Sequence, residues 1–229
     1  MEDHLNYDKF NLNTLCEFPI ITTIGRRGTG KTWINLKILN YLDQDTSLNK
    51  IIIYSPTERM NALYSVKFHT TKNLTIKHTL NEQELKNIIE DQINNPDQKI
   101  ILVLDDAFGP KYKNKYLSDI IKNNKDYRIT LLMTFQFPIR FKKPILNKFD
   151  YIFLLNEDFL SNIKRINKQY ANTAISTVEY DLHDPVKLFS RFKFFEPVFT
   201  ALTQKFEAMV INKRVESSDV KKKIFWFKI

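Results

Sequence analysis

Residues 20–32 of the chain read IITTIGRRGTGKT. An apolar, β-branched run ends at Ile24, the pattern G-x-x-x-x-G-K-[ST] is matched without exception from Gly25 to Thr32, and a segment with helical spacing follows. In this order of strand, glycine-rich turn and helix, the pattern forms a phosphate-binding loop. Glycines let successive backbone N–H groups point at phosphate oxygens, and the helix start adds its positive dipole end. The stretch predicts a nucleotide site inside an α/β fold.

Each residue of this loop has an expected role. The backbone cradles the phosphates along Gly25, Arg26, Arg27, Gly28, Thr29 and Gly30. Lys31 is expected to reach the β and γ phosphates, and the Thr32 hydroxyl to ligate Mg²⁺. The competing interpretation is a strand-to-helix turn that binds nothing. It leaves unexplained why three of the chain's four glycines gather here, directly before Lys-Thr.

Two further strand ends carry polar side chains. Asp105 and Asp106 follow the apolar run Ile100–Leu104, and Gln136 follows the run that includes Thr130–Phe135. Asp105 is expected to hold Mg²⁺ through water beside Thr32, while Asp106, on the other face, orients or deprotonates an attacking water. Gln136 is expected to bond the γ-phosphate or that water. Alternatively, the two acids are solvated turn residues before Ala107-Phe108-Gly109-Pro110, and Gln136 merely ends its strand.

The rest of the chain predicts alternating strands and helices. Apolar runs of strand length are Ile20–Ile24, Ile51–Tyr54, Leu74–Ile76, Ile100–Leu104, Ile129–Thr134 and Tyr151–Leu155. Helical spacing occurs at Lys31–Leu42, after Asn81, at Tyr116–Ile121 and at Phe159–Ile166. Consecutive apolar positions are typical of central strands covered on both faces. We therefore predict an α/β, P-loop NTPase fold with a mainly parallel central sheet covered by helices on both faces.

The helix after Asn81 and the C-terminal part have more specific signals. Asn81–Glu84 reads as a capping box, followed by a stripe expected to be buried and a stop at Asn95-Pro96; the stripe is Leu85, Ile88, Ile89 and Ile93. Near the end of the chain, Phe194–Pro197 is expected to break the pattern before a short helix at Phe199–Phe206. Ala208–Ile211 and Ile224–Phe227 then predict an antiparallel hairpin at the sheet edge. We expect one ATPase domain over 1–229, with an N-terminal extension (1–17), a core (18–190) and a helix-and-hairpin addition (191–229).

Composition narrows the class of protein. Among 229 residues, 43% are hydrophobic and 27% charged, and the formal net charge is +9, which favours polyanionic partners. Cys16 is the single cysteine, so an intrachain disulfide and a cysteine-cluster metal site are excluded, and His4, His69, His78 and His183 form no metal-spaced pair. No apolar run reaches the length of a membrane span, and the N-terminus lacks the pattern of a secretory signal. A soluble, intracellular protein is expected.

Taken together, these residues resemble the DNA-packaging ATPases of nucleocytoplasmic large DNA viruses and virophages, in the FtsK–HerA superfamily of P-loop ATPases. The resemblance runs from about Phe18 to the C-terminus. It rests on the arginine-containing loop, the Asp105-Asp106 strand end, Gln136 with Pro144–Asn147 after it, and the closing strands Phe206–Asn212 and Ile224–Lys228. It implies an ATP- and Mg²⁺-dependent motor that forms a homo-oligomeric ring around double-stranded DNA and moves it into a capsid. Capsid proteins are then possible partners, and the host-cell cytoplasm or the virion is the expected location.

Two positions depart from the family's pattern. Most of the wider superfamily has Glu where Asp106 stands, although the viral branch is similar in using Asp. Many relatives have Arg where this chain has Leu146, so an arginine role cannot be carried over to that position. Arg140, four residues after Gln136, is the nearest alternative for an arginine that acts on the neighbouring subunit's site.

Basic residues alternate with aromatic ones in two segments. Phe137–Lys143, with Arg140, Lys142 and Lys143, offers phosphate contacts along DNA, and the sequence leaves open whether it makes them. For Lys221–Lys228, contact with DNA phosphates is the less favoured interpretation. The segment is better explained as an edge strand whose lysines deter pairing with other strand edges.

The sequence leaves three other functions open. These are another ring-forming P-loop DNA motor or helicase, a nucleoside or nucleotide phosphotransferase, and a nucleotide-dependent binding module without turnover. The phosphotransferase lacks an evident arginine-rich lid, and Asp106 with Gln136 suits attack by water.

Overall fold

The computed structural model describes residues 6–44, 49–108, 114–171, 189, 191–204, 206–217 and 219–229. Parts of the predictions lie outside these residues: 1–5 of the N-terminal extension, 45–48, 109–113, 172–188 and 190 of the core, and 205 and 218 of the helix-and-hairpin addition. Gly109 and Pro110 of the turn after Asp106 are among them. The chain divides into two compact units, described separately below. The central unit comprises Leu12–Ile20 and Thr32–Phe135, and the terminal unit comprises Met1–Asn11, Ile21–Lys31 and Gln136–Ile229.

The central unit is built on a parallel sheet. Its strands are β2 (Asn49–Tyr54), β3 (Leu74–Lys77), β4 (Lys99–Leu104) and β5 (Ile129–Phe135), in the order β3-β2-β4-β5. Every residue of β5 is buried, as are Ile100–Leu104 of β4, which confirms the prediction that consecutive apolar runs form doubly covered strands. The Leu131 N–H donates to the Pro19 carbonyl at 3.0 Å, so the segment that enters β1 pairs with β5. The sheet thus carries the Asp105 end of β4 beside the end of β5.

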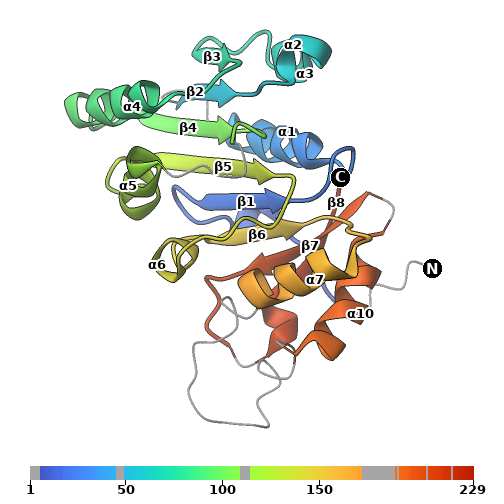
Figure 1. Cartoon of the computed structure of the whole chain (residues 1–229). Coiled ribbons are helices and arrows are strands. Elements are labelled where there is room, and N and C mark those ends of the chain that lie inside the picture. Colours follow the sequence, from blue (N-terminus) through green and yellow to red (C-terminus); the bar gives the residue numbers. More distant parts are fainter. Residues whose placement is uncertain are drawn as a thin grey trace. The chain divides into compact units, whose positions relative to one another are not determined.

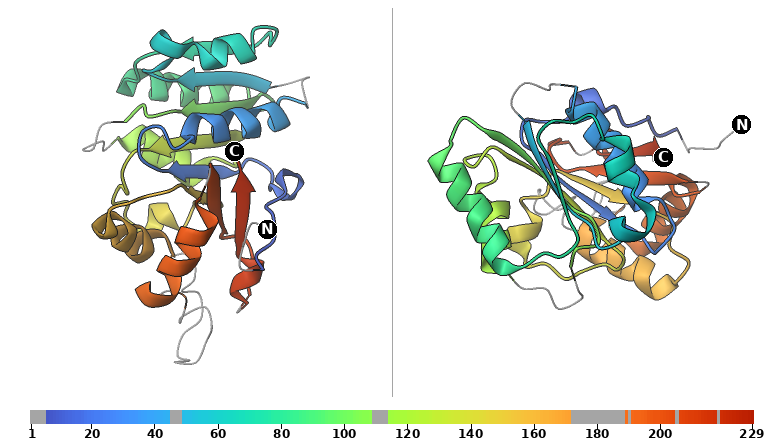
Figure 2. Two further views of the ribbon diagram at one scale, coloured as in Figure 1. Left: turned by 90° about the vertical axis from the view of Figure 1, so that its right-hand side faces the viewer. Right: turned by 90° about the horizontal axis from the view of Figure 1, so that it is seen from above.

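Helices cover both faces of this sheet. In Figure 1 and Figure 2, α4 (Glu82–Asn94) and α5 (Lys115–Asn123) lie on one face and α1 (Lys31–Leu42) on the other. The short turns η1 (Leu12–Thr14), α2 (Glu58–Asn61) and α3 (Leu63–Lys67) complete the unit. The predicted helices at 31–42 and 116–121 are confirmed.

Helix α4 begins and ends as predicted but differs in its buried face. The Asn81 side chain accepts from the Glu84 N–H at 2.9 Å, as in a capping box, whereas the Glu84 carboxylate pairs with Lys77. The prediction that Ile93 is buried is wrong, since this side chain is 62% exposed and Gln92 is buried instead. At 100° per residue, Gln92 lies about 20° from Leu85 around the helix axis and Ile93 about 80°.

The terminal unit contains β1 (Ile20–Ile24, whose first residue belongs to the central unit), β6 (Tyr151–Leu154), β7 (Glu207–Asn212) and β8 (Ile224–Lys228). β1 and β6 are parallel, β6 and β7 antiparallel, and β7 and β8 antiparallel. Figure 2 shows β7 and β8 side by side, and the short 3₁₀ turn η3 (Val220–Lys222) precedes β8. The predicted C-terminal hairpin is confirmed.

The N-terminal extension is anchored on this hairpin. Lys9 bridges to Trp226 of β8, and the Phe10 N–H donates to the Trp226 carbonyl at 2.7 Å. The Phe10 ring is 3% exposed and makes edge contacts with Phe153, Phe225 and two further rings, Tyr151 and Phe227. This aromatic cluster joins the extension, β6 and β8 into one core.

The remaining helices of the terminal unit are α6 (Lys143–Leu146), α7 (Leu160–Ile166) with the π-helical turn η2 (Asn167–Ala171), and α10 (Phe192–Leu202). The prediction that Phe194–Pro197 breaks the helical pattern is wrong: α10 contains Pro197 and ends before Phe206. Burial of Phe195, Phe199 and Leu202 on one face offsets the hydrogen bond that the proline removes. Within the described residues, no helix has both the length and the hydropathy needed to cross a membrane.

Candidate active site

The glycine-rich loop lies in the terminal unit, between the end of β1 and the start of α1. Gly28 and Gly30 have φ angles of +82° and +105°, which side-chain-bearing residues rarely adopt. A Cβ at Gly25 would lie 2.6 Å from Leu155 Cβ and 2.7 Å from Thr29 Oγ1. The curl of this loop therefore requires glycine at Gly25 and Gly30, which the sequence pattern specifies, and favours it at Gly28, which the pattern leaves open.

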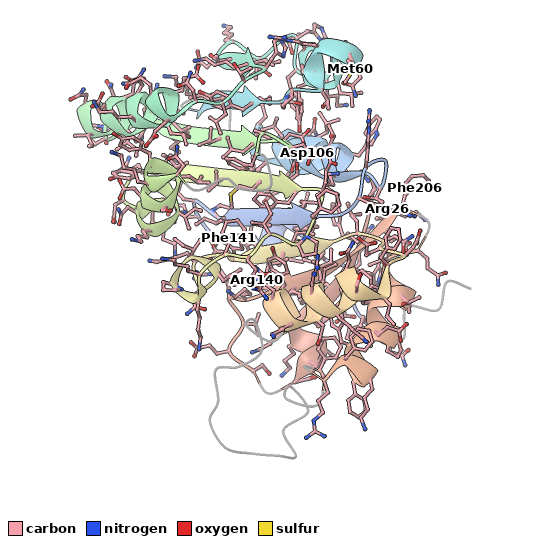
Figure 3. The ribbon with its side chains drawn as sticks, viewed as in Figure 1. Arg26, Met60, Asp106, Arg140, Phe141 and Phe206 are labelled. Atoms are coloured by element: carbon pink, nitrogen blue, oxygen red, sulfur yellow. The ribbon has the colours of Figure 1, made fainter. Side chains whose placement is uncertain are left out.

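The Arg26 carbonyl is the acceptor around which the loop closes. Thr29 Oγ1 donates to it at 2.8 Å and the Lys31 ammonium at 3.2 Å. Lys31 is 5% exposed, so its charge is held against the loop backbone and away from bulk water. The Arg26 guanidinium (labelled in Figure 3) forms an ion pair with Asp158, and Arg27 is exposed. The loop thus combines the positive-φ backbone of a glycine-rich turn with a desolvated ammonium, two features of a phosphate-binding loop.

The next residue along the chain, Thr32, belongs to the central unit and contacts Asp105 there. Thr32 Oγ1 donates to Asp105 Oδ2 at 2.9 Å. The same carboxylate accepts from Thr134 Oγ1 at 2.7 Å and from the Tyr64 hydroxyl at 3.0 Å. Asp105 is 1% exposed, and burial raises the pKa of its carboxyl above the usual value, while the three hydroxyl donors act in the opposite direction. The structure therefore brings together two of the residues predicted to bind Mg²⁺.

Asp106 has a different environment from that of its neighbour. Its φ is +50°, and its side chain, labelled in Figure 3, is partly exposed. Its N–H donates to Thr134 Oγ1 at 2.8 Å, so one threonine hydroxyl binds the carboxylate of Asp105 and the backbone of Asp106. This contact holds Asp106 in a backbone conformation that is uncommon for residues other than glycine. The Asp105 carboxylate is thereby fixed in the interior, whereas the Asp106 carboxylate is partly buried and accepts a long contact of 3.4 Å from Thr134 Oγ1.

Tyr64 and Thr134 are contacts of the site that were not predicted from the sequence. Tyr64 is fully buried, and its hydroxyl accepts from Asn35 Nδ2 at 3.3 Å while it donates to Asp105. Its segment is fixed by the Glu58 carboxylate, which accepts the N–H groups of Tyr64 and Ser65 at 3.1 and 2.8 Å. Thr134 was identifiable, because it is a polar residue near the end of the buried strand that precedes Gln136. Tyr64 carries no such signal.

The other predicted site residues are placed as follows. Gln136 directly follows β5, belongs to the terminal unit and is partly exposed. Arg140 is exposed and lines a separate cavity in the same unit. The roles of all the predicted site residues, those of Thr32 and Asp105 included, remain predictions.

The donors of the site fit the predicted cofactors. Mg²⁺ prefers oxygen ligands and is usually bound by one or two protein side chains together with substrate phosphates, and the hydroxyl of Thr32 and carboxylate of Asp105 are such donors, 2.9 Å apart. A cation would also favour the ionised form of Asp105, which burial disfavours. The positive-φ glycines and the buried Lys31 ammonium fit a triphosphate.

Comparison with known proteins identifies the family. The chain is 30% identical to the uncharacterized protein L437 of Acanthamoeba polyphaga mimivirus over 245 residues, which cover 98% of this chain and 79% of L437. The chain belongs to the family of L437. A second protein of this virus, the uncharacterized protein L649, is 26% identical over 170 residues, which cover 72% of this chain and 54% of L649. A scan against models of known protein families found no match.

Solved structures of similar shape identify the fold of this chain. The genome-packaging NTPase B204 from Sulfolobus turreted icosahedral virus 2, in complex with ATPγS, matches 93% of this chain and 98% of its own with a TM-score of 0.62 and 13% identity. Its complex with AMP gives a TM-score of 0.61 over 89% of this chain and 96% of its own. The predicted fold class, a P-loop ATPase fold with a C-terminal antiparallel hairpin, is confirmed. The resemblance to viral packaging ATPases is confirmed at the level of this fold.

Proposed function

We propose that this protein is a Mg²⁺-dependent ATPase that moves double-stranded DNA into a viral capsid. The observation that carries the proposal is the hydrogen bond from Thr32 to the buried Asp105, one residue after the glycine-rich loop that holds Lys31. A hydroxyl and a buried carboxylate at this position form the metal-binding half of a triphosphate site. The fold shared with a genome-packaging NTPase supports the link to DNA packaging.

In the proposed mechanism the chain's groups have separate tasks. The loop N–H groups and Lys31 bind the β and γ phosphates, and Thr32 and Asp105 hold Mg²⁺, which when bound offsets phosphate charge. Thr134 keeps Asp105 in place through its 2.7 Å hydrogen bond. Asp106, partly exposed at the strand end, accepts the proton of the attacking water, and Gln136 orients that water. ATP and water thus give ADP and phosphate.

The second part of the proposal is that ATP hydrolysis moves DNA through a ring of subunits. The net charge of +9 favours a polyanion such as DNA. Subunits in a homo-oligomeric ring, joined head to tail, would place Arg140 of one at the γ-phosphate of the next. Capsid proteins are the further partners, and the host-cell cytoplasm or the virion is the place of action.

The central experiment measures phosphate release from ATP and Mg²⁺ with no addition, with duplex DNA, and with nucleosides as acceptors. We expect ATP hydrolysis that is faster in the presence of duplex DNA. Added nucleosides should not be phosphorylated in place of water. A strand-displacement assay on the same duplex separates the two motors, because a packaging motor translocates duplex DNA without separating its strands and a helicase separates them. Phosphorylation of a nucleoside would favour the phosphotransferase, and tight binding without phosphate release would favour a binding module.

The matched variants are Lys31→Ala and Lys122→Ala. Lys31 contacts the loop, whereas Lys122 is an exposed lysine of α5 outside the predicted site residues. Lys31→Ala should abolish turnover and weaken calorimetric binding of a non-hydrolysable ATP analogue, and Lys122→Ala should do neither. Near-normal turnover in folded Lys31→Ala would refute the nucleotide site.

A further inference from the structure

A cavity of about 690 Å³ in the terminal unit is lined by four cationic side chains: Arg140, Lys143, Arg165 and Lys168. The described residues that line it include no acidic side chain; Phe141 and Leu146 are among the apolar ones. Arg140 and Phe141 are labelled in Figure 3, beside the α7 helix that carries Arg165. This volume is in the range of cavities that hold a nucleotide-sized group.

The four cations come from two distant segments that the fold ties together. Arg140 and Lys143 lie before and at the start of α6, and Arg165 and Lys168 lie three residues apart at the end of α7 and in η2, on one helical face. The buried Tyr170 donates from its hydroxyl to the Ile139 carbonyl at 2.8 Å, and Gln169 donates to the same oxygen. The loop that carries Arg140 is therefore held against the turn that carries Lys168.

Within the part of the chain that the structure describes, these cations have no anionic partner of their own. None of the four side chains takes part in an ion pair there. Four like charges around one cavity repel one another, and an anion in the cavity converts that repulsion into attraction. Arginine binds phosphate oxygens in a bidentate manner, and lysine adds point charges. The apolar side chains beside them suit the sugar or base that accompanies a phosphate.

We propose that this cavity is a second phosphate-binding site, built from residues other than those of the Gly25–Thr32 loop. The ligand chemistry is a phosphate group, carried either by the backbone of DNA or by a free triphosphate. The sequence predicts that Arg140, Lys142 and Lys143 act together. In the structure, Lys142 does not line the cavity, whereas Arg165 and Lys168 line it together with Arg140 and Lys143. The inference deepens the proposed function, but its test measures binding without hydrolysis, so an inactive ATPase site leaves it standing.

The test compares two double variants in a Lys31→Ala background, which removes the lysine that binds phosphate at the loop. Arg165→Gln with Lys168→Gln removes two charges from the cavity, and Lys221→Gln with Lys222→Gln removes two exposed charges of η3 in the same unit. One arm measures anisotropy of a labelled 20-base-pair duplex of arbitrary sequence over a range of salt concentrations. The other measures calorimetric binding of inorganic tripolyphosphate.

We expect the cavity variant to bind at least one ligand about tenfold or more weakly, and the η3 variant to bind it within about twofold of the background. If the ligand is DNA, the slope of log affinity against log salt should become shallower by about 0.9 for each phosphate that the variant no longer neutralises. Weaker duplex binding alone assigns the cavity to the DNA backbone, and weaker tripolyphosphate binding assigns it to a free triphosphate. Equal weakening in both double variants, or no change in either, overturns the proposal.

A pair of single variants guards against misfolding. Lys142 and Lys143 are adjacent and both exposed, but only Lys143 lines the cavity. Lys143→Gln should weaken the same ligand and Lys142→Gln should not, with both unfolding at the temperature of the background protein. If the two weaken binding equally, the effect is one of net charge and the cavity is not a site.

Discussion

The Tyr64 hydroxyl donates a hydrogen bond to Asp105 Oδ2 at 3.0 Å, the same oxygen that accepts from Thr32. Tyr64 is fully buried and belongs to α3, a short helix far from the loop in sequence. Burial and the Asp105 charge both raise the pKa of this phenol, so it stays a donor at physiological pH. Tyr64 is thus placed to orient the carboxylate that we propose binds Mg²⁺.

Tyr64→Phe should raise the Mg²⁺ concentration needed for half-maximal ATP hydrolysis by about tenfold, because an outer hydrogen bond that orients a metal ligand is removed. Activity at saturating Mg²⁺ should recover most of its wild-type level. The measurement is phosphate release as a function of Mg²⁺ at fixed ATP. A purely structural role predicts instead a lower unfolding temperature with an unchanged Mg²⁺ requirement, and that result would contradict this one.

The two consecutive aspartates should separate binding from chemistry. Asp106→Asn should keep Mg²⁺-dependent ATP binding yet slow hydrolysis by about 10² or more, since Asp105 and Thr32 remain while proton acceptance is removed. Asp105→Asn should abolish the Mg²⁺ dependence of binding. Calorimetry with a non-hydrolysable analogue and single-turnover hydrolysis measure the two effects. If Asp106→Asn abolished binding while Asp105→Asn did not, the two roles would be exchanged.

Local patterns of the sequence predicted most of the fold but not the contacts around Asp105. Strand runs, the glycine pattern and the Asn81 cap depend on residues close in sequence, and the structure contains each of them. Tyr64 is 41 residues from Asp105, and no periodicity marks a tyrosine whose hydroxyl meets a distant carboxylate. Such a contact is decided by tertiary packing alone.

The difference between local sequence patterns and tertiary contacts also explains which predictions were wrong or incomplete. Pro197 signals a helix break locally, but buried Phe195 and Phe199 on either side retain α10. The basic segment at Arg140–Lys143 was visible in sequence, whereas its association with Arg165 and Lys168 depends on Tyr170 and the Ile139 carbonyl. Clusters assembled across the fold therefore require the structure.

Phe10→Ala should destabilise the protein strongly although the residue lies in the N-terminal extension. The ring is 3% exposed and contacts rings of β6 and β8. Removal of a buried phenylalanine and the cavity that it leaves cost about 3 kcal/mol or more. Urea unfolding measures the change, with Phe10→Leu as the conservative control at about 1 kcal/mol. A change of a few tenths of a kcal/mol for Phe10→Ala would show that the extension is not part of this core.

Lys213 should make stability rise with pH in the alkaline range. Its side chain donates to the Leu146 carbonyl, and burial lowers its pKa from 10.5 to about 8, although the Asp150 charge acts in the opposite direction. Between pH 8 and 10.5 the unfolded chain therefore binds a proton that the folded chain has released. The free energy of unfolding then increases with pH across this window, by at most about 1.4 kcal/mol per pH unit. Lys213→Met should flatten the rise in urea unfolding across the same window, and an identical pH dependence in both proteins would exclude this cause.

Duplex DNA of any sequence should stimulate hydrolysis, with an affinity that falls log-linearly as salt rises, because phosphate contacts release counterions. Replacing Arg140, Lys142 and Lys143 with Ala should reduce this stimulation more than nucleotide binding, and basal hydrolysis should drop too if Arg140 reaches a neighbour's γ-phosphate. The measurement is phosphate release against DNA concentration at several salt concentrations. If a folded protein hydrolysed ATP at a rate independent of both DNA and salt concentration, the phosphotransferase alternative would be favoured instead.

Specific activity should rise with protein concentration, because subunits of a head-to-tail ring share their active sites. Sedimentation at the same concentrations should show the assembly forming in parallel. If Arg140 acts on the neighbour's γ-phosphate, Arg140→Ala and Lys31→Ala are each inactive alone. The Arg140→Ala subunit still has an intact phosphate-binding loop, and the Lys31→Ala subunit still has an intact Arg140. Mixing them should restore part of the hydrolysis, since some neighbouring pairs then combine an intact loop with an intact arginine. Basal hydrolysis by Arg140→Ala alone would remove this arginine from the shared site, and activity that is independent of concentration in a monomer would remove the ring.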